Sequence, residues 1–131
     1  MLKLTKKVEY ALISLAHMSN QKKNHLSSAA KIAEQYLIPS EVLAKLLQQL
    51  AACDIIESVK GPLGGYRLKT DIHLINIVDL IEKVEGPIGL MDCAIPMGCD
   101  QIDCCTIKKP LTKINEKIIN TLKQITLDQI R

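Results

Sequence analysis

The sequence predicts a mainly α-helical fold that carries one small β-hairpin, and three observations lead to this. Apolar residues make up 47 % of the 131 residues, yet Phe and Trp are absent, so the core must be built from Leu, Ile, Val and Ala. Several segments repeat these residues at helical spacing. One glycine-rich turn, Gly61-Pro62-Leu63-Gly64-Gly65, separates two short runs of strand-forming residues. A chain of this length can bury a core without disulfide bonds.

The first two helices are predicted from apolar spacing and from capping residues. Apolar positions recur at helical intervals over 8–18, after Thr5, whose hydroxyl can cap a helix. A polar break follows, and Ser27 or Ser28 can cap a second helix over 29–36. Both helices therefore have a defined start in the sequence.

The third helix is predicted over 39–52, with Pro39 at the first helical position, where proline is tolerated. Its inward stripe is expected to consist of Val42, Leu43, Leu46, Leu47 and Leu50. Two short helices joined by a tight turn, the second with a polar outer face, are typical of a helix-turn-helix. The side chains on this helix that are placed to reach base edges or phosphates are Ser40, Glu41, Ala44, Lys45 and Gln48.

A hairpin is predicted directly after this helix, with strands over 55–60 and 66–69. We expect Ile55, Val59 and Leu68 to pack on the helices, since an isolated hairpin is marginal in water. A hairpin at this place is the wing of a winged helix-turn-helix. The wing residues expected to contact DNA are Lys60, Gly61, Gly64, Gly65, Tyr66 and Arg67.

A glycine-rich hairpin with solvated lysines is the alternative interpretation of this segment, and the preceding helix pair favours DNA binding over it. A phosphate-binding loop is disfavoured because these glycines join two strands instead of opening a helix. The charge distribution agrees with a polyanionic partner. Residues 1–70 contain ten Lys and Arg against five Asp and Glu, whereas residues 71–131 contain seven against nine.

Two further function classes are disfavoured by the sequence. No apolar run approaches the roughly 18 residues that a membrane span needs, and no signal peptide is recognisable at the first residues. We therefore expect a cytoplasmic protein without a membrane partner. An enzyme is not expected, because no Cys, His and Asp constellation surrounds a candidate nucleophile.

Two more helices are predicted beyond the hairpin. Asn76 can cap a helix over 77–84 that Gly86-Pro87 ends, and Pro110 is expected to open the last helix. The apolar face of that last helix is too large for a domain already closed by residues 1–85, so we expect it to pack along a second copy. The residues expected in this dimer interface are Ile114, Ile118, Leu122 and Ile125. The chain thus divides into a winged helix-turn-helix over 1–85, a cysteine-rich segment over 86–109 and a dimerisation helix with tail over 110–131.

The cysteine-rich segment concentrates four of the five cysteines within thirteen residues, Cys93, Cys99, Cys104 and Cys105. It contains no Lys or Arg between Gly86 and Cys105. In a reducing compartment such a cluster indicates a metal or redox site. The regular spacing Cys-x5-Cys-x5-Cys suits an iron–sulfur cluster better than a zinc site with paired cysteine knuckles. A metal-free thiol switch is the alternative. Cys53, at the end of the third helix, is expected to be a packed thiol.

These segments together resemble the Rrf2 family of bacterial winged-helix transcription regulators, many of which sense through an iron–sulfur cluster. The resemblance rests on Leu4-Thr5, on Glu9-Tyr10-Ala11-Leu12, on the wing over 58–68, on the spacing of three cysteines and on Ile125-Thr126-Leu127. Residues 85–88 and 113–115 look most like the branch that regulates the SUF iron–sulfur assembly system.

The resemblance implies a homodimer that binds a double-stranded operator, with the last helix in the dimer interface. It also implies Cys93, Cys99 and Cys105 as cluster ligands. Where Isc-type relatives have a ligand His this chain has Lys108, and Glu9 occupies the position of an acidic ligand that nitric-oxide-sensing relatives supply from the partner subunit. We expect a [2Fe–2S] cluster in preference to [4Fe–4S].

The expected function is thus a dimeric regulator, most simply a repressor, of iron–sulfur assembly genes that responds to cluster, iron or redox status. Two alternatives are a cluster-free thiol sensor that binds DNA and a zinc-stabilised interaction module. The wing departs from the family pattern at two positions, since Lys60 stands where Arg is common and Leu63 replaces a frequent glycine.

Overall fold

The computed structural model describes residues 3–91 and 104–130, so the predicted ligands Cys93 and Cys99 lie outside the described residues. In these ranges the chain is mainly helical with one two-stranded antiparallel hairpin, as the sequence predicts. The elements in chain order are α1 (Lys6–Ser19), α2 (Ala29–Tyr36), α3 (Ser40–Ala52), β1 (Ile56–Val59), β2 (Gly65–Leu68), η1 (Ile72–Leu74), α4 (Ile77–Glu85), α5 (Lys108–Lys123) and η3 (Leu127–Gln129). No helix in the described ranges is long and apolar enough to span a membrane.

Side-chain caps set the starts of the first two helices. The Thr5 hydroxyl accepts a hydrogen bond of 3.3 Å from the Val8 amide, and the Ser28 hydroxyl accepts one of 3.1 Å from the Lys31 amide. Of the two serines considered, Ser28 is therefore the cap of α2. The Ser27 hydroxyl is buried and has no hydrogen-bond partner among the residues that the structure describes.

The turn between α2 and α3 is tight because Leu37 adopts a left-handed conformation with φ of 55°. The Ile38 amide then donates to the Ala33 carbonyl at 2.9 Å. Pro39 precedes α3 with ψ of 123°, so it is the N-cap and the prediction that it is the first helical residue is wrong by one position. Its carbonyl still accepts from the Leu43 amide, which starts the helix.

The core-facing stripe of α3 consists of four leucines that are completely buried, Leu43, Leu46, Leu47 and Leu50. Val42 was expected among them and is 43 % exposed, because it lies at the edge of the stripe defined by the leucines. The same core takes in residues of α1, α2, β1, η1 and α4, and also Leu127 from the C-terminal segment.

The hairpin pairs Ile56 with Leu68, Glu57 with Arg67 and Val59 with Gly65. One face therefore packs Ile56 and Leu68 on the core, and the opposite face carries Glu57 and Arg67. Val59 shares the latter face and is 37 % exposed, so the expectation that it packs on the helices is wrong.

A third segment of backbone joins the hairpin, which the sequence did not indicate. Ser27 and Tyr66 exchange two backbone hydrogen bonds, each of 2.8 Å. These bonds attach the connection between α1 and α2 to the outer edge of β2. The hairpin is thereby anchored on both sides, by α3 and by this connection.

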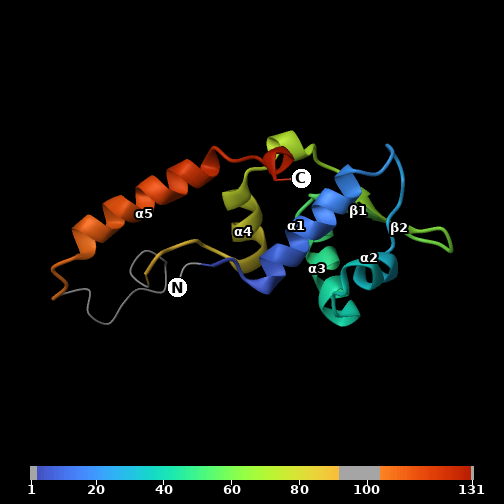
Figure 1. The fold of residues 1–131 in the computed structure, drawn as a ribbon, viewed down its shortest axis with the longest axis horizontal. Coiled ribbons are helices and arrows are strands. Elements are labelled where there is room, and N and C mark those ends of the chain that lie inside the picture. Colours follow the sequence, from blue (N-terminus) through green and yellow to red (C-terminus); the bar gives the residue numbers. More distant parts are fainter. Residues whose placement is uncertain (1–2, 92–103, 131) are drawn as a thin grey trace.

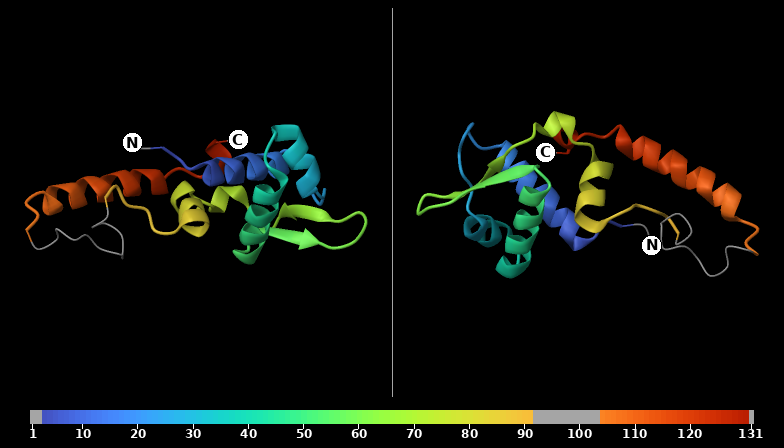
Figure 2. Two further views of the ribbon diagram at one scale, coloured as in Figure 1. Left: turned by 90° about the horizontal axis from the view of Figure 1, so that it is seen from below. Right: turned by 180° about the vertical axis from the view of Figure 1, so that it is seen from behind.

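The helix α5 begins at Lys108, two residues before the predicted start, and places Pro110 in the first turn, where no backbone donor is needed. It extends away from the compact body formed by α1–α4 and the hairpin, and its C-terminal end leads back to that body (Figure 1). The further views in Figure 2 show the same arrangement, with the hairpin and the start of α5 at opposite ends of the molecule.

The segment after α5 is fixed to the body by backbone pairing. The Ile77 amide donates to the Ile125 carbonyl and the Leu127 amide donates to the Ile75 carbonyl, both at 2.9 Å. Leu127 is 5 % exposed. His73 Nδ1 lies 3.1 Å from Asp128 Oδ2, which joins η1 to η3.

The attachment of this segment is expected to weaken in acid. The Thr126 hydroxyl donates to Asp128 and, with a smaller contribution from His73, holds the pKa of that carboxyl below its ordinary value of 3.8. A depressed pKa in the folded state stabilises the fold above the unfolded value, and this contribution is lost as pH falls through the folded pKa. Unfolding followed from pH 6 to pH 2 should therefore show a steeper loss of stability for the wild type than for Asp128→Asn. Parallel curves would contradict this role of Asp128.

Candidate nucleic-acid interface and cluster ligands

The outer face of α3 presents the side chains that the sequence predicted for DNA contact. Ser40, Glu41, Lys45 and Gln48 are exposed, and Ala44 is half-buried between them and the core. The neighbouring Gln49 has a structural part instead, because its Nε2 donates to the carbonyls of Lys83 and Val84 at 2.8 and 3.2 Å. These bonds satisfy carbonyls in the last turn of α4 and hold it against α3. The exposed face therefore stands on a helix fixed by packing and hydrogen bonds.

The wing turn depends on glycine at two positions where a side chain does not fit. A Cβ atom at Gly64 would lie 2.1 Å from the Val59 carbonyl oxygen, and one at Gly65 would lie 2.7 Å from the Ser27 carbonyl oxygen. Gly61 has φ of 118°, a conformation that other residues rarely adopt. The glycines thus make the tip of the hairpin narrow, as a turn that enters a DNA groove must be.

Two of the basic residues on the hairpin are already engaged in cross-strand or local ion pairs. Arg67 Nε lies 2.5 Å from Glu57 Oε1, as their position in register permits, and Lys69 Nζ lies 2.9 Å from Asp54 Oδ1. The hydrogen bond from Lys69 lowers the pKa of Asp54. Lys60 is exposed and forms no ion pair among the residues that the structure describes. From the sequence, Lys60 and Arg67 are both expected to contact DNA, and the pairing of Arg67 with Glu57 across the strands is what distinguishes the two in the structure.

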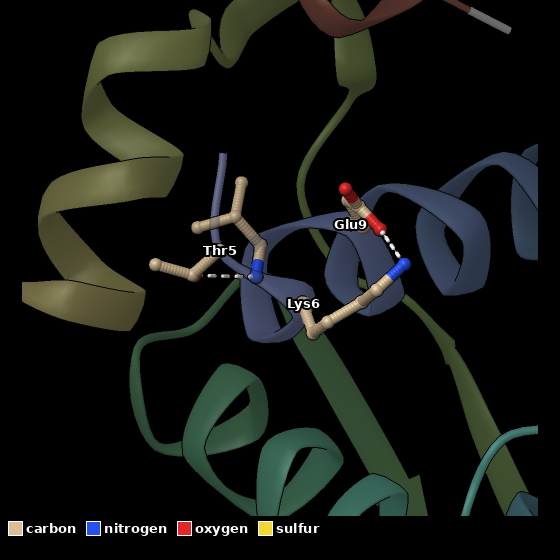
Figure 3. Close-up of polar contacts among 4 residues, drawn as sticks. Thr5, Lys6 and Glu9 are labelled. Atoms are coloured by element: carbon tan, nitrogen blue, oxygen red, sulfur yellow. Dashed lines mark hydrogen bonds and ion pairs between the residues drawn. The ribbon is translucent and has the colours of Figure 1, made fainter. Parts of the chain in front are cut away.

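The predicted cluster ligands lie on different parts of the chain. Glu9 is on α1, where its Oε2 lies 2.9 Å from Lys6 Nζ, and its side chain is 42 % exposed (Figure 3). Cys105 is half-buried and stands just before α5, whose N-terminal end is the part farthest from the body in Figure 1. Among the residues that the structure describes, no three His, Cys, Asp or Glu side chains gather into a metal site.

The donor set fits an iron–sulfur cluster in its chemistry. Thiolates are the ligands that such clusters take, and the preceding segment from Gly86 carries no cation that would compete for them. Glu9 lies on α1 in the compact body, whereas the N-terminal end of α5, which follows Cys105, extends away from that body (Figure 1).

Two of the predicted dimer residues, Ile118 and Leu122, line an open groove of about 570 Å³ between α5, the N-terminal part of α1 and the end of α4. Ile114 is 47 % exposed on the same helix, and Ile125 is half-buried where the chain returns to the body. The remaining lining residues are Lys3, Leu4, Thr5, Val8, Ile81, Glu85, Gly86, Pro87, Ile88, Gly89 and Leu90.

Comparison with known proteins identifies the family of this chain. A family model described as Rrf2, iron-dependent transcriptional regulator, matches residues 4–131. The chain belongs to the Rrf2 family. The resemblance to this family is thereby confirmed, and α2, α3 and the β1–β2 hairpin form the winged helix-turn-helix. This Rrf2 chain is a DNA-binding transcriptional regulator and not an enzyme.

A relative supports the family assignment, and two solved structures share the fold. The Rrf2 chain is 30 % identical to the HTH-type transcriptional regulator NsrR of Bacillus licheniformis, with 98 % of this chain and 92 % of the relative covered. CymR (YrzC), the global cysteine regulator of B. subtilis, superposes with a TM-score of 0.76 at 22 % identity, covering 99 % of this chain and 96 % of CymR. IscR of T. potens gives a TM-score of 0.75 at 24 % identity, covering 98 % and 85 %. The two structures show the shared fold.

Proposed function

We propose that this Rrf2 regulator is a homodimeric repressor of iron–sulfur assembly genes, most like the SUF branch, that senses cluster, iron or redox status. One observation carries the proposal. Cys105 lies just before α5, and the segment that follows α5 is hydrogen-bonded to Ile75 and Ile77 of the winged-helix body through Ile125 and Leu127. A change at the cysteine segment therefore has a direct mechanical route to the winged helix.

The cysteines Cys93, Cys99 and Cys105 would hold the cluster as thiolates, and a [2Fe–2S] type is favoured over [4Fe–4S]. A bound cluster would supply iron–thiolate bonds and a redox-active centre at this segment. Glu9 of the partner subunit would supply a carboxylate. Its ion pair with Lys6 is exposed and local, so it does not lock the carboxylate in place.

The second chain required by this ligand set would pack on the groove beside α5. The groove is lined by Ile118 and Leu122, and Ile114, one helical turn before Ile118 on α5, is half-exposed, which supports a helix of a second copy as its occupant. In that arrangement one α3 and one wing per subunit would meet the two half-sites of an operator. A shift of α5 would change the distance between the two α3 helices and between the two wings, and so the affinity for DNA.

Anaerobic reconstitution with iron and sulfide tests the proposal. The wild type should gain a visible absorbance band and an EPR signal on reduction, and Cys105→Ser should lose both. Cys104→Ser is the matched control, because its thiol is adjacent, and it should keep the band. Glu9→Ala should keep the thiolates but shorten the lifetime of the band in air.

Three outcomes would contradict the proposal. Colourless, tight zinc binding would favour the zinc-stabilised module, and peroxide-reversible DNA binding by the metal-free protein would favour the thiol sensor. A Glu9→Ala variant with an unchanged spectrum and lifetime would remove Glu9 from the ligand set. DNA binding measured with and without cluster, and the mass in solution by light scattering, complete the test.

A further inference from the structure

The tip of the hairpin presents one large apolar side chain to solvent. Leu63 is 89 % exposed, and it lies outside the hydrophobic core, which on the hairpin includes Ile56, Tyr66 and Leu68. The fold therefore gains nothing from a leucine at this position. An apolar side chain held out at the end of a rigid turn is suited to contact with a partner.

The turn holds this side chain in a fixed place. The Gly64 amide donates to the Gly61 carbonyl at 3.0 Å, which closes a four-residue turn with Pro62 and Leu63 at its two corners. Proline fixes its own φ, and the space beneath Gly64 is filled by the Val59 carbonyl. Only Pro62 and Leu63 carry side chains between the two glycines, so the tip is narrow and Leu63 is its most prominent group.

The positive charge around the tip indicates a negatively charged partner. Lys60 adjoins the turn and has no ion-pair partner among the described residues, whereas Arg67 and Lys69 lower on the hairpin are held by Glu57 and Asp54. Residues 58–66 contain no Asp or Glu. A narrow turn with an exposed cation fits a narrow, negatively charged groove, and an apolar side chain at its end can insert between stacked bases. The minor groove of DNA, about 6 Å wide, is such a groove.

We propose that Leu63 enters the minor groove as a wedge between two base pairs and bends the operator, while Lys60 contacts a neighbouring phosphate. Leucine is among the side chains that unstack a base step from this groove and kink the duplex. Pyrimidine–purine steps unstack most easily, so the operator should carry such a step under each wing. The inference rests on DNA binding by this chain and adds a residue that reads DNA deformability.

The test uses the full chain and duplexes that the wild type selects from a random-sequence pool. Dissociation constants, their salt dependence and the end-to-end distance of dye-labelled duplexes are measured for each variant. Leu63→Ala should weaken binding about tenfold, keep the salt dependence of the wild type and straighten the bound duplex. Lys60→Gln should lower the slope against salt by about one and keep the bend.

Leu74→Ala is the matched control, since Leu74 is 77 % exposed on η1 and lies outside the hairpin and α3. It should bind and bend the duplex like the wild type. All three variants should unfold at the temperature of the wild type, because the side chains that they remove are exposed. A Leu63→Ala protein with the affinity and bend of the wild type overturns the wedge and leaves the proposed sensing function intact. A wild-type chain that selects no duplex in either cluster state overturns both.

Discussion

Replacing Leu43 by alanine is expected to lower the free energy of unfolding by about 3 kcal/mol. Leu43 is completely buried on α3, inside the stripe of leucines that faces the core. The substitution loses the transfer free energy of the removed methyl groups and leaves a cavity that the surrounding helices fill only in part. Urea denaturation at a fixed protein concentration measures the change, since dimerisation would otherwise alter the apparent stability.

Val42→Ala is the matched control for this substitution, because it is the preceding residue on the same helix and is 43 % exposed. Its effect should stay within about 0.5 kcal/mol. Equal losses for the two variants would mean that α3 buries a different face from the one described. The pair therefore also tests the orientation of α3, on which the proposed DNA contacts depend.

Gly64→Ala is expected to weaken DNA binding about 10- to 100-fold while the helical body remains folded. The added Cβ would meet the Val59 carbonyl oxygen at 2.1 Å and the Gly61 carbonyl oxygen at 2.9 Å, so the backbone of the turn must move. Local strain of about 1–3 kcal/mol corresponds to this loss of affinity. The tip contributes no residue to the core, so the loss should appear in binding more than in global stability.

Amide exchange separates this effect from the loss of a side chain. The amide at position 64 donates to the Gly61 carbonyl and should exchange faster in Gly64→Ala, because the turn opens. Leu63→Ala, one residue away, changes no backbone requirement and should leave that exchange rate as in the wild type. An unchanged rate in Gly64→Ala together with normal DNA binding would show that the turn accommodates the methyl group.

The helices and the hairpin could be predicted because their signals are local. Thr5, Ser28 and Asn76 occupy cap positions, and the leucines of α3 repeat with the period of a helix. The errors at Val42 and Val59 have one physical origin. A residue at the edge of an apolar stripe, or on a strand with one solvated face, is apolar without being buried, and the distinction depends on what packs there.

The features that could not be predicted depend on residues distant in sequence. The bonds of Ser27 with Tyr66 and of Gln49 with the end of α4 follow from tertiary packing. The engagement of Arg67 by Glu57 follows from a strand register that the loop length alone does not fix. For the proposed cluster, the spacing indicates the cysteines, whereas the proposed ligand Glu9 would depend on the geometry between two chains, which one sequence does not encode locally.

The attachment of the C-terminal segment fixes the C-terminal end of α5 to the body and leaves its N-terminal end extended away from it. Its sixteen residues span about 24 Å, and the backbone bonds of Ile125 and Leu127 fix one end as a pivot. A sideways displacement at the Lys108 end would then tilt the helix about this attachment and produce a smaller displacement at residues 75–77. Residues 75–77 lead into the start of α4, and the Lys83 carbonyl at the other end of α4 accepts a hydrogen bond from Gln49 of α3.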